Sequence, residues 1–96
     1  MKHWMSDPDI RAVVVLEIDI PSLEYFSCPM MIDGEAYDGR IILRGKAINA
    51  GSTFEADIKF LDAIRAMPNL VIGKELFLWH GRVIGRAEVS RIYPNR

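Results

Sequence analysis

The fold is decided by residues 75–92, which read ELFLWHGRVIGRAEVSRI. β-branched and aromatic residues flank Gly81 on both sides, and such residues suit a pleated, half-buried surface. Glycine at position 81 adopts the positive φ of a tight turn at no steric cost. The stretch therefore predicts a β-hairpin, with two strands folded back on each other.

A turn at Gly81 and Arg82 determines which side chains of this hairpin face inward. With a two-residue turn, the inward set is Leu76, Leu78, Gly85, Ala87 and Val89. The outward set is then Phe77, Trp79, Ile84, Arg86 and Glu88. A four-residue loop gives the same arrangement, whereas a three- or five-residue loop reverses it.

This register predicts an exposed apolar patch made of Phe77, Trp79 and Ile84, flanked by Arg82 and Arg86. An exposed apolar group with arginines at its rim is typical of a surface that binds a partner. Two alternatives stand beside this interpretation. A loop or the N-terminal segment covers the patch, or the register is reversed.

Two further stretches alternate between apolar and polar residues, which indicates strands with one buried face. In residues 10–20 the predicted inward side chains are Ile10, Ala12, Val14, Leu16, Ile18 and Ile20. In residues 53–62 they are Phe54, Ala56, Ile58 and Phe60. Residues 40–44 predict a shorter strand, and residues 70–72 a strand-like segment.

The segment of residues 22–38 is predicted to be a long irregular connection. Ser22 is positioned to cap one helical turn, and residues 30–32 predict a short extended piece. Turn signals follow one another along the segment: Cys28-Pro29, Asp33-Gly34 and Asp38-Gly39. Asp62 is placed to cap a single helical turn over residues 63–66, which Pro68 would end.

Length and composition indicate one globular domain of 96 residues, with residues 1–9 as a lead-in and residues 10–96 as the domain. Twelve basic and thirteen acidic residues give a net charge of −1, which argues against strong binding to nucleic acid or to an anionic membrane. The single cysteine, Cys28, cannot form an internal disulfide, so a reducing cytoplasm is expected. No apolar run approaches the roughly 20 residues that a membrane span needs.

Five or six strands at even spacing, without a long amphipathic helix between them, predict an all-β antiparallel fold. A small closed barrel is favoured because closure removes exposed strand edges.

Residues 70–89, LVIGKELFLWHGRVIGRAEV, resemble the end of the third domain of elongation factor Tu. Gly81, Arg82, Ile84 and Gly85 lie at the matching spacing. Upstream, residues 28–31 with Tyr37 and the following strand are similar to that family, as are residues 54–61, so the resemblance covers most of residues 10–92. It implies a six-stranded antiparallel Greek-key barrel.

The chain also departs from that family. Leu78 stands where the family has arginine, and the chain lacks the phosphate-binding loop motif of a GTPase domain. In the family, the third domain contacts the T-stem of aminoacyl-tRNA and an exchange factor, but those contact residues find no match here. The resemblance therefore implies the fold and not a site.

The other reactive residues are scattered. Cys28, His80 and His3 do not predict a catalytic dyad or a zinc site, so a small buried apolar cysteine is the favoured interpretation. Three acids near Gly34 could hold Ca²⁺ weakly, although turn formation explains them better: Asp33, Glu35 and Asp38. We therefore expect no catalytic residue, metal or cofactor.

Six basic residues come from segments that could share one side of a barrel and contact RNA: Arg40, Arg44, Lys46, Arg82, Arg86 and Arg91. Acidic residues hold similar outward positions, which favours ordinary solvated strand faces.

The sequence thus predicts a non-catalytic, stand-alone, translation-factor-like β-barrel that binds a protein or ribonucleoprotein partner through Phe77, Trp79, Arg82, Ile84 and Arg86. A protein partner is favoured over RNA, no membrane contact is expected, and a homodimer through the patch is compatible. The alternative is a small cytosolic immunity- or inhibitor-type protein that blocks a toxin or enzyme. That class tends to be acidic, and this chain is not. A third hypothesis, an enzyme that uses the long loop, requires Cys28 to contact a histidine in a deep polar pocket.

Overall fold

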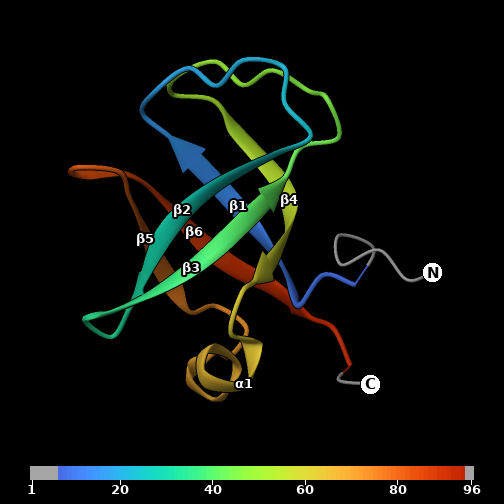
Figure 1. The fold of residues 1–96 in the computed structure, drawn as a ribbon, viewed down its shortest axis with the longest axis vertical. Coiled ribbons are helices and arrows are strands. Elements are labelled where there is room, and N and C mark those ends of the chain that lie inside the picture. The colour runs from blue at the N-terminus through green and yellow to red at the C-terminus, as the bar shows by residue number, and fades with distance from the viewer. Residues whose placement is uncertain (1–6, 95–96) are drawn as a thin grey trace.

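The computed structural model describes residues 7–94 of the chain. Within this part, six antiparallel strands close into a barrel, and a short helical segment lies at one end of it (Figure 1). The strands are β1 (Ile10–Leu16), β2 (Tyr25–Ile32), β3 (Glu35–Ile42), β4 (Thr53–Phe60), β5 (Glu75–Trp79) and β6 (Val83–Ile92), and the helical turns are α1 (Ala63–Ala66) and η2 (Met67–Asn69).

Around the barrel the strands follow the order β1-β4-β3-β2-β5-β6, and β6 pairs with β1 to close the ring. The run β1-β4-β3-β2 is a Greek key, because three consecutive strands lie side by side and β1 lies beside the last of them. The predicted all-β fold, a closed six-stranded antiparallel barrel, is therefore confirmed.

The interior is filled by the inward side chains of all six strands, as the two-residue periodicity predicts. Alternate residues of β1 are completely buried, and the inward residues of β4 are buried from Ala56 to Phe60, with Phe54 partly exposed. The largest fully buried side chains include Phe60, Leu16, Met30, Leu76 and Leu78. No polar or charged residue among residues 7–94 is buried, so the core gains its stability from apolar contact.

The prediction of an irregular connection over residues 22–38 is wrong, because most of this segment forms the β2–β3 hairpin. The signal at Asp33-Gly34 does mark a turn, in which both residues have positive φ, 51° and 84°. This two-residue turn is the type whose twist matches that of the flanking strands. Residues 25 and 26 lie in β2, so the helical turn predicted after Ser22 does not form.

The two remaining turn signals of this segment lie inside strands and face each other across the ladder. Cys28 pairs with Gly39 and Pro29 with Asp38. Counted from the turn, Pro29 falls on a non-hydrogen-bonded position, where its missing N–H costs no bond to β3. A Cβ on Gly39 would lie 2.8 Å from the sulfur of Met30, so glycine here leaves room for that buried side chain.

The connections between strands follow the sequence more closely. Ile20 is buried and forms an isolated bridge with Ile48, which joins two long loops at one end of the barrel. Asp62 caps α1 as predicted, its carboxylate accepting a hydrogen bond from the backbone N–H of Arg65. Pro68 lies within η2 and does not end the helical segment, and residues 70–72 do not form a strand.

Asp9 belongs to the barrel, although the sequence places it in the lead-in. Its backbone N–H donates to the carbonyl of Ile58, and its carboxylate accepts from the N–H of Phe60 at 2.8 Å. Residues 1–6, which include Trp4 and His3, lie outside the described residues.

Candidate partner-binding surface

The β5–β6 hairpin has the predicted pairing. Leu78 lies opposite Gly85, Leu76 lies opposite Ala87, and all four are buried. The loop, however, has three residues, 80–82, which by itself would reverse the register. A register shift between Leu78 and Trp79 marks a β-bulge that restores the predicted alternation.

The bulge overturns the predicted placement of Ile84, which is buried and belongs to the core. Trp79 pairs with Val83, whereas Leu78 pairs with Gly85, so Ile84 is the extra residue of β6. The backbone of β1 occupies the place where a Gly85 side chain would lie, and the bulge turns the neighbouring Ile84 into the core. Ile84 is therefore not part of an exposed patch.

Three large apolar side chains remain on the outer face of the hairpin. Phe77, Trp79 and Val83 are 43%, 41% and 46% exposed, and we call them the hairpin patch. Val83 was not among the predicted residues, but it occupies the place beside Trp79 that Ile84 was expected to hold. Met31 of β2, which is partly buried, pairs with Phe77 and extends the apolar surface across the barrel wall.

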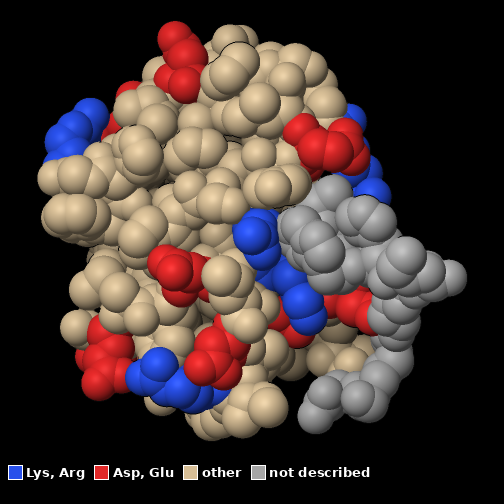
Figure 2. Space-filling model, viewed as in Figure 1, with Lys and Arg blue, Asp and Glu red and all other residues tan. Residues whose placement is uncertain are grey.

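The predicted arginines lie beside this patch, and each has an acidic neighbour. Arg82 lies 3.5 Å from Glu17, and Arg86 lies 3.7 Å from Glu75. All four side chains are at least half exposed, so these ion pairs contribute little to stability. The space-filling view shows a broad uncharged area over β2 and towards the β5–β6 loop, with charges at its margins (Figure 2).

Cys28 is buried, as the favoured interpretation of the sequence predicts. Burial raises the pKa of its thiol to about 11, with a hydrogen bond to the Trp79 backbone partly offsetting the effect. The thiol is therefore protonated near neutral pH. His80, in the hairpin loop, packs edge-on against the ring of Phe26, with 6.2 Å between the ring centroids.

The acidic residues near Gly34 bond to separate partners. Asp33 accepts a hydrogen bond from Lys74 at 2.6 Å, and Glu35 accepts one from the hydroxyl of Tyr37 at 3.0 Å. Across residues 7–94, no three His, Cys, Asp or Glu side chains are arranged so that they could hold a metal ion.

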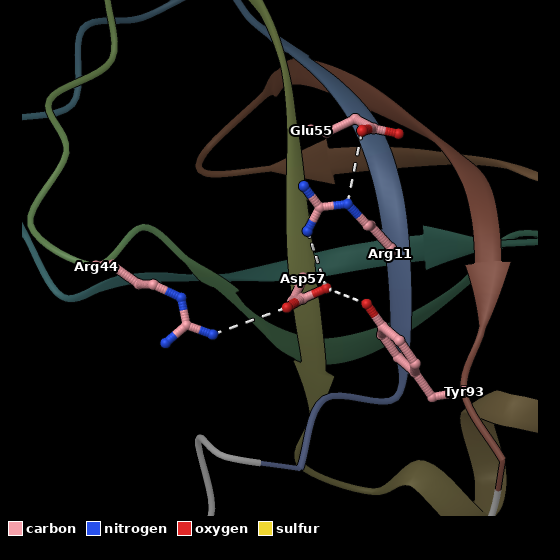
Figure 3. A network of polar contacts seen from close by, with 5 residues as sticks. All are labelled: Arg11, Arg44, Glu55, Asp57 and Tyr93. Atoms are coloured by element: carbon pink, nitrogen blue, oxygen red, sulfur yellow. Dashed lines mark hydrogen bonds and ion pairs between the residues drawn. The ribbon is translucent and has the colours of Figure 1, made fainter.

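A polar network lies on the other side of the barrel, over β1 and β4. Asp57 accepts hydrogen bonds from Tyr93 at 2.6 Å and from Arg11 at 3.2 Å, and Arg44 lies 3.8 Å from it. Figure 3 shows these side chains approaching Asp57 from three sides. The hydrogen bond to Asp57, with burial second, raises the pKa of Tyr93. Arg11 also lies 3.6 Å from Glu55.

The structure separates basic residues that the sequence grouped together. Arg82 and Arg86 belong to the β5–β6 hairpin, whereas Arg40 and Arg44 lie in and just after β3, and Arg91 lies near the end of β6. Strand order decides this separation, because β4 and β5 lie opposite each other in the ring.

No protein-family model matches this chain, and a search of curated proteins finds no match. Among residues 7–94, none of the helical segments has the length and apolar character to cross a lipid bilayer.

Proposed function

We propose that this protein is a non-catalytic binding module that engages a protein or ribonucleoprotein partner through the hairpin patch. The observation that supports this function best is the exposure of Phe77, Trp79 and Val83, side by side on two paired strands. The resemblance of residues 70–89 to the third domain of elongation factor Tu supports a stand-alone, translation-factor-like role. The lone cysteine is compatible with work in the reducing cytoplasm.

The physical argument rests on how these three side chains are held. They project from strands of a closed barrel, so a partner would meet a preformed surface and little ordering entropy would be lost on binding. Tryptophan is enriched among residues that dominate binding energy, and truncation of such a residue typically costs about 2 kcal/mol or more. Trp79 is the natural anchor of this surface.

The ion pairs at the rim give the patch a polar border. Arg82 and Arg86 are largely exposed, and their bonds to Glu17 and Glu75 are weak enough to be exchanged for bonds to a partner. Such rim contacts affect association rate and orientation more than affinity.

Affinity capture from native lysate tests the proposal, with the intact chain compared with Trp79→Ala and Phe77→Ala. The matched control is Ile64→Ala, because Ile64 is an apolar residue of α1 that is 88% exposed and lies away from the hairpin. A partner held through the patch is lost with the first two variants and kept with the control. If Trp79→Ala and Phe77→Ala keep the Tm of the intact chain and still capture the same partner, the hairpin patch is not the binding surface.

Nuclease treatment of the lysate separates the two kinds of partner. A captured set that is lost after digestion indicates a ribonucleoprotein, and one that survives indicates a protein. Identification of a toxin or an enzyme in a surviving set, with its activity suppressed by the intact chain, would favour the inhibitor alternative.

A further inference from the structure

The side of the barrel opposite the hairpin patch carries a second surface. In the ring of six strands, β4 lies opposite β5 (Figure 1). Four arginines lie on this side, and we call them the arginine wall: Arg11, Arg40, Arg44 and Arg91. The four come from β1, β3, the loop after β3, and β6. Two of them, Arg11 and Arg44, contact Asp57.

The arginine wall combines exposed cations with carboxylates that differ in exposure. The side chain of Arg44 is 68% exposed and that of Arg11 is 37% exposed, whereas that of Asp57 is 15% exposed. Asp9 is similarly covered, and it bonds to Lys59 and to a backbone N–H. A molecule that approaches this side therefore meets Arg44 before Asp57, whereas Glu55, whose side chain is 50% exposed, lies at the surface beside Arg11.

The strand register places like charges directly opposite each other on this wall. Arg11 pairs with Arg91 across β1 and β6, and Arg40 pairs with Lys59 across β3 and β4. Like charges at such positions destabilise a sheet. Arg11 also lies opposite Asp57 on β4, and Lys59 bonds to Asp9, so these carboxylates offset part of the repulsion.

Aromatic rings hold two of these arginines in place. The guanidinium of Arg40 lies 5.3 Å from the ring centroid of Tyr25, and that of Arg91 lies 5.2 Å from that of Tyr93. Stacking on a ring restricts the positions that a guanidinium group can take.

From this arrangement we infer that the arginine wall is a second binding surface, which takes a carboxylate-rich segment of a protein. The fork of a guanidinium group matches a carboxylate, and Arg11 already contacts two carboxylates, with Nη1 3.2 Å from Asp57 and Nε 3.6 Å from Glu55. The surface is separate from the hairpin patch, so both can be occupied at the same time.

The same residues favour an acidic peptide over a nucleic acid strand. Nucleic acid strands bind to basic surfaces that offer free aromatic faces to the bases. On this wall, the rings of Tyr25 and Tyr93 are each covered by an arginine. Asp57 and Glu55 also interrupt the run of positive charge, which disfavours a continuous track of phosphates but leaves discrete positions for carboxylates.

Fluorescence anisotropy with a fluorescein-labelled oligoglutamate peptide tests this inference, at low ionic strength and again at about 0.15 M, where the Debye length is about 8 Å. We expect saturable binding by the intact chain that weakens with salt. An oligouridylate of equal charge is the competing probe. Tighter binding of oligouridylate than of oligoglutamate would overturn the inference.

The wall variant carries Arg44→Asn and Arg91→Gln. Asparagine suits position 44 because Arg44 has a φ of 54°, which alanine adopts less readily. The matched control carries Arg82→Gln and Arg86→Gln, which remove two arginines that are also exposed and singly paired. Peptide affinity should fall roughly tenfold in the wall variant and stay unchanged in the control.

An equal loss of affinity in both double variants, or no saturable binding by the intact chain, would refute the inference. If the wall variant unfolds at a lower temperature, Arg91→Gln alone provides the test, since the contact that it removes is the stacking of Arg91 on Tyr93. Trp79→Ala should leave peptide binding unchanged, so this surface and the hairpin patch can fail independently.

Discussion

The close approach of β1 to β6 at Gly85 leads to a sharp prediction about stability. A Cβ added to Gly85 would lie 2.3 Å from the carbonyl oxygen of Val15 and 3.1 Å from the Cα of Leu16. Both are backbone atoms of β1, a strand held between β4 and β6. Gly85→Ala must therefore separate β1 from β6 beside the hydrogen bond from Glu17 to Ile84, which measures 2.7 Å.

The expected cost follows from these contacts. Overpacking a close-packed site costs about 1–3 kcal/mol, and a weakened backbone hydrogen bond adds about 1 kcal/mol. Replacing glycine with alanine returns about 0.4–1 kcal/mol, because the unfolded chain loses conformational freedom. We expect Gly85→Ala to lower the free energy of unfolding by about 2 kcal/mol, or Tm by at least about 8 °C in a domain of this size.

Gly39→Ala is the matched control, since Gly39 is also a buried strand glycine without positive φ. Its added Cβ would meet the Sδ and Cε atoms of Met30 at 2.8 and 2.9 Å. Those atoms end a flexible side chain that can rotate away, so the cost should stay below about 1 kcal/mol. Urea unfolding followed by circular dichroism measures both variants. If Gly85→Ala is no less stable than Gly39→Ala, the contact between β1 and β6 is looser than described.

Three further predictions concern the core, the cysteine and the polar network. Phe60→Ala should lower the free energy of unfolding by about 3–5 kcal/mol, whereas Ile64→Ala at an exposed site should change it by less than about 0.5 kcal/mol. Burial raises the pKa of Cys28 to about 11 from the ordinary thiol value of 9.0, so folding favours the protonated thiol. Its stabilising effect is complete below about pH 9 and is lost as the pH rises through about 11, and Cys28→Ala should reduce that loss in urea titrations across this range. Tyr93→Phe removes a donor to Asp57 and should cost roughly 0.5–1.5 kcal/mol, and an unchanged unfolding midpoint would contradict the role of this hydrogen bond.

The parts of the fold that the sequence predicts are the strands with one buried face and one solvent-exposed face. Alternation in residues 10–20 and 53–62 predicts β1 and β4, because the inward side chains are apolar and most outward ones are polar, with Val13 and Val15 as the exceptions in β1. The β2–β3 hairpin was missed since Pro29 and Gly39 are ordinarily turn formers. Their tolerance depends on contacts across the sheet, with Asp38 opposite Pro29 and the Met30 side chain beside Gly39, which a single segment does not reveal.

The candidate surface was predicted in part for the same reason. Phe77, Trp79, Arg82 and Arg86 lie outward or in the loop as expected, because the bulge compensates for the odd loop length. The sequence places Ile84 on the outer face, because a β-bulge does not change the alternation of apolar and polar residues from which the register is predicted. The arginine wall could not be separated from the hairpin arginines before strand order was known.

Closure of the barrel also limits how any partner can bind. Many β-domains recognise peptides by adding a strand to an open sheet edge, where the backbone supplies the hydrogen bonds. Here β6 pairs with β1, so the ring offers no such edge along these strands. Recognition therefore depends on side chains of the outer wall, where apolar groups lie over β5 and cations lie over β4. A partner that binds one side should tolerate substitutions on the other side. Single substitutions that leave Tm unchanged should therefore weaken binding to one surface and preserve binding to the other.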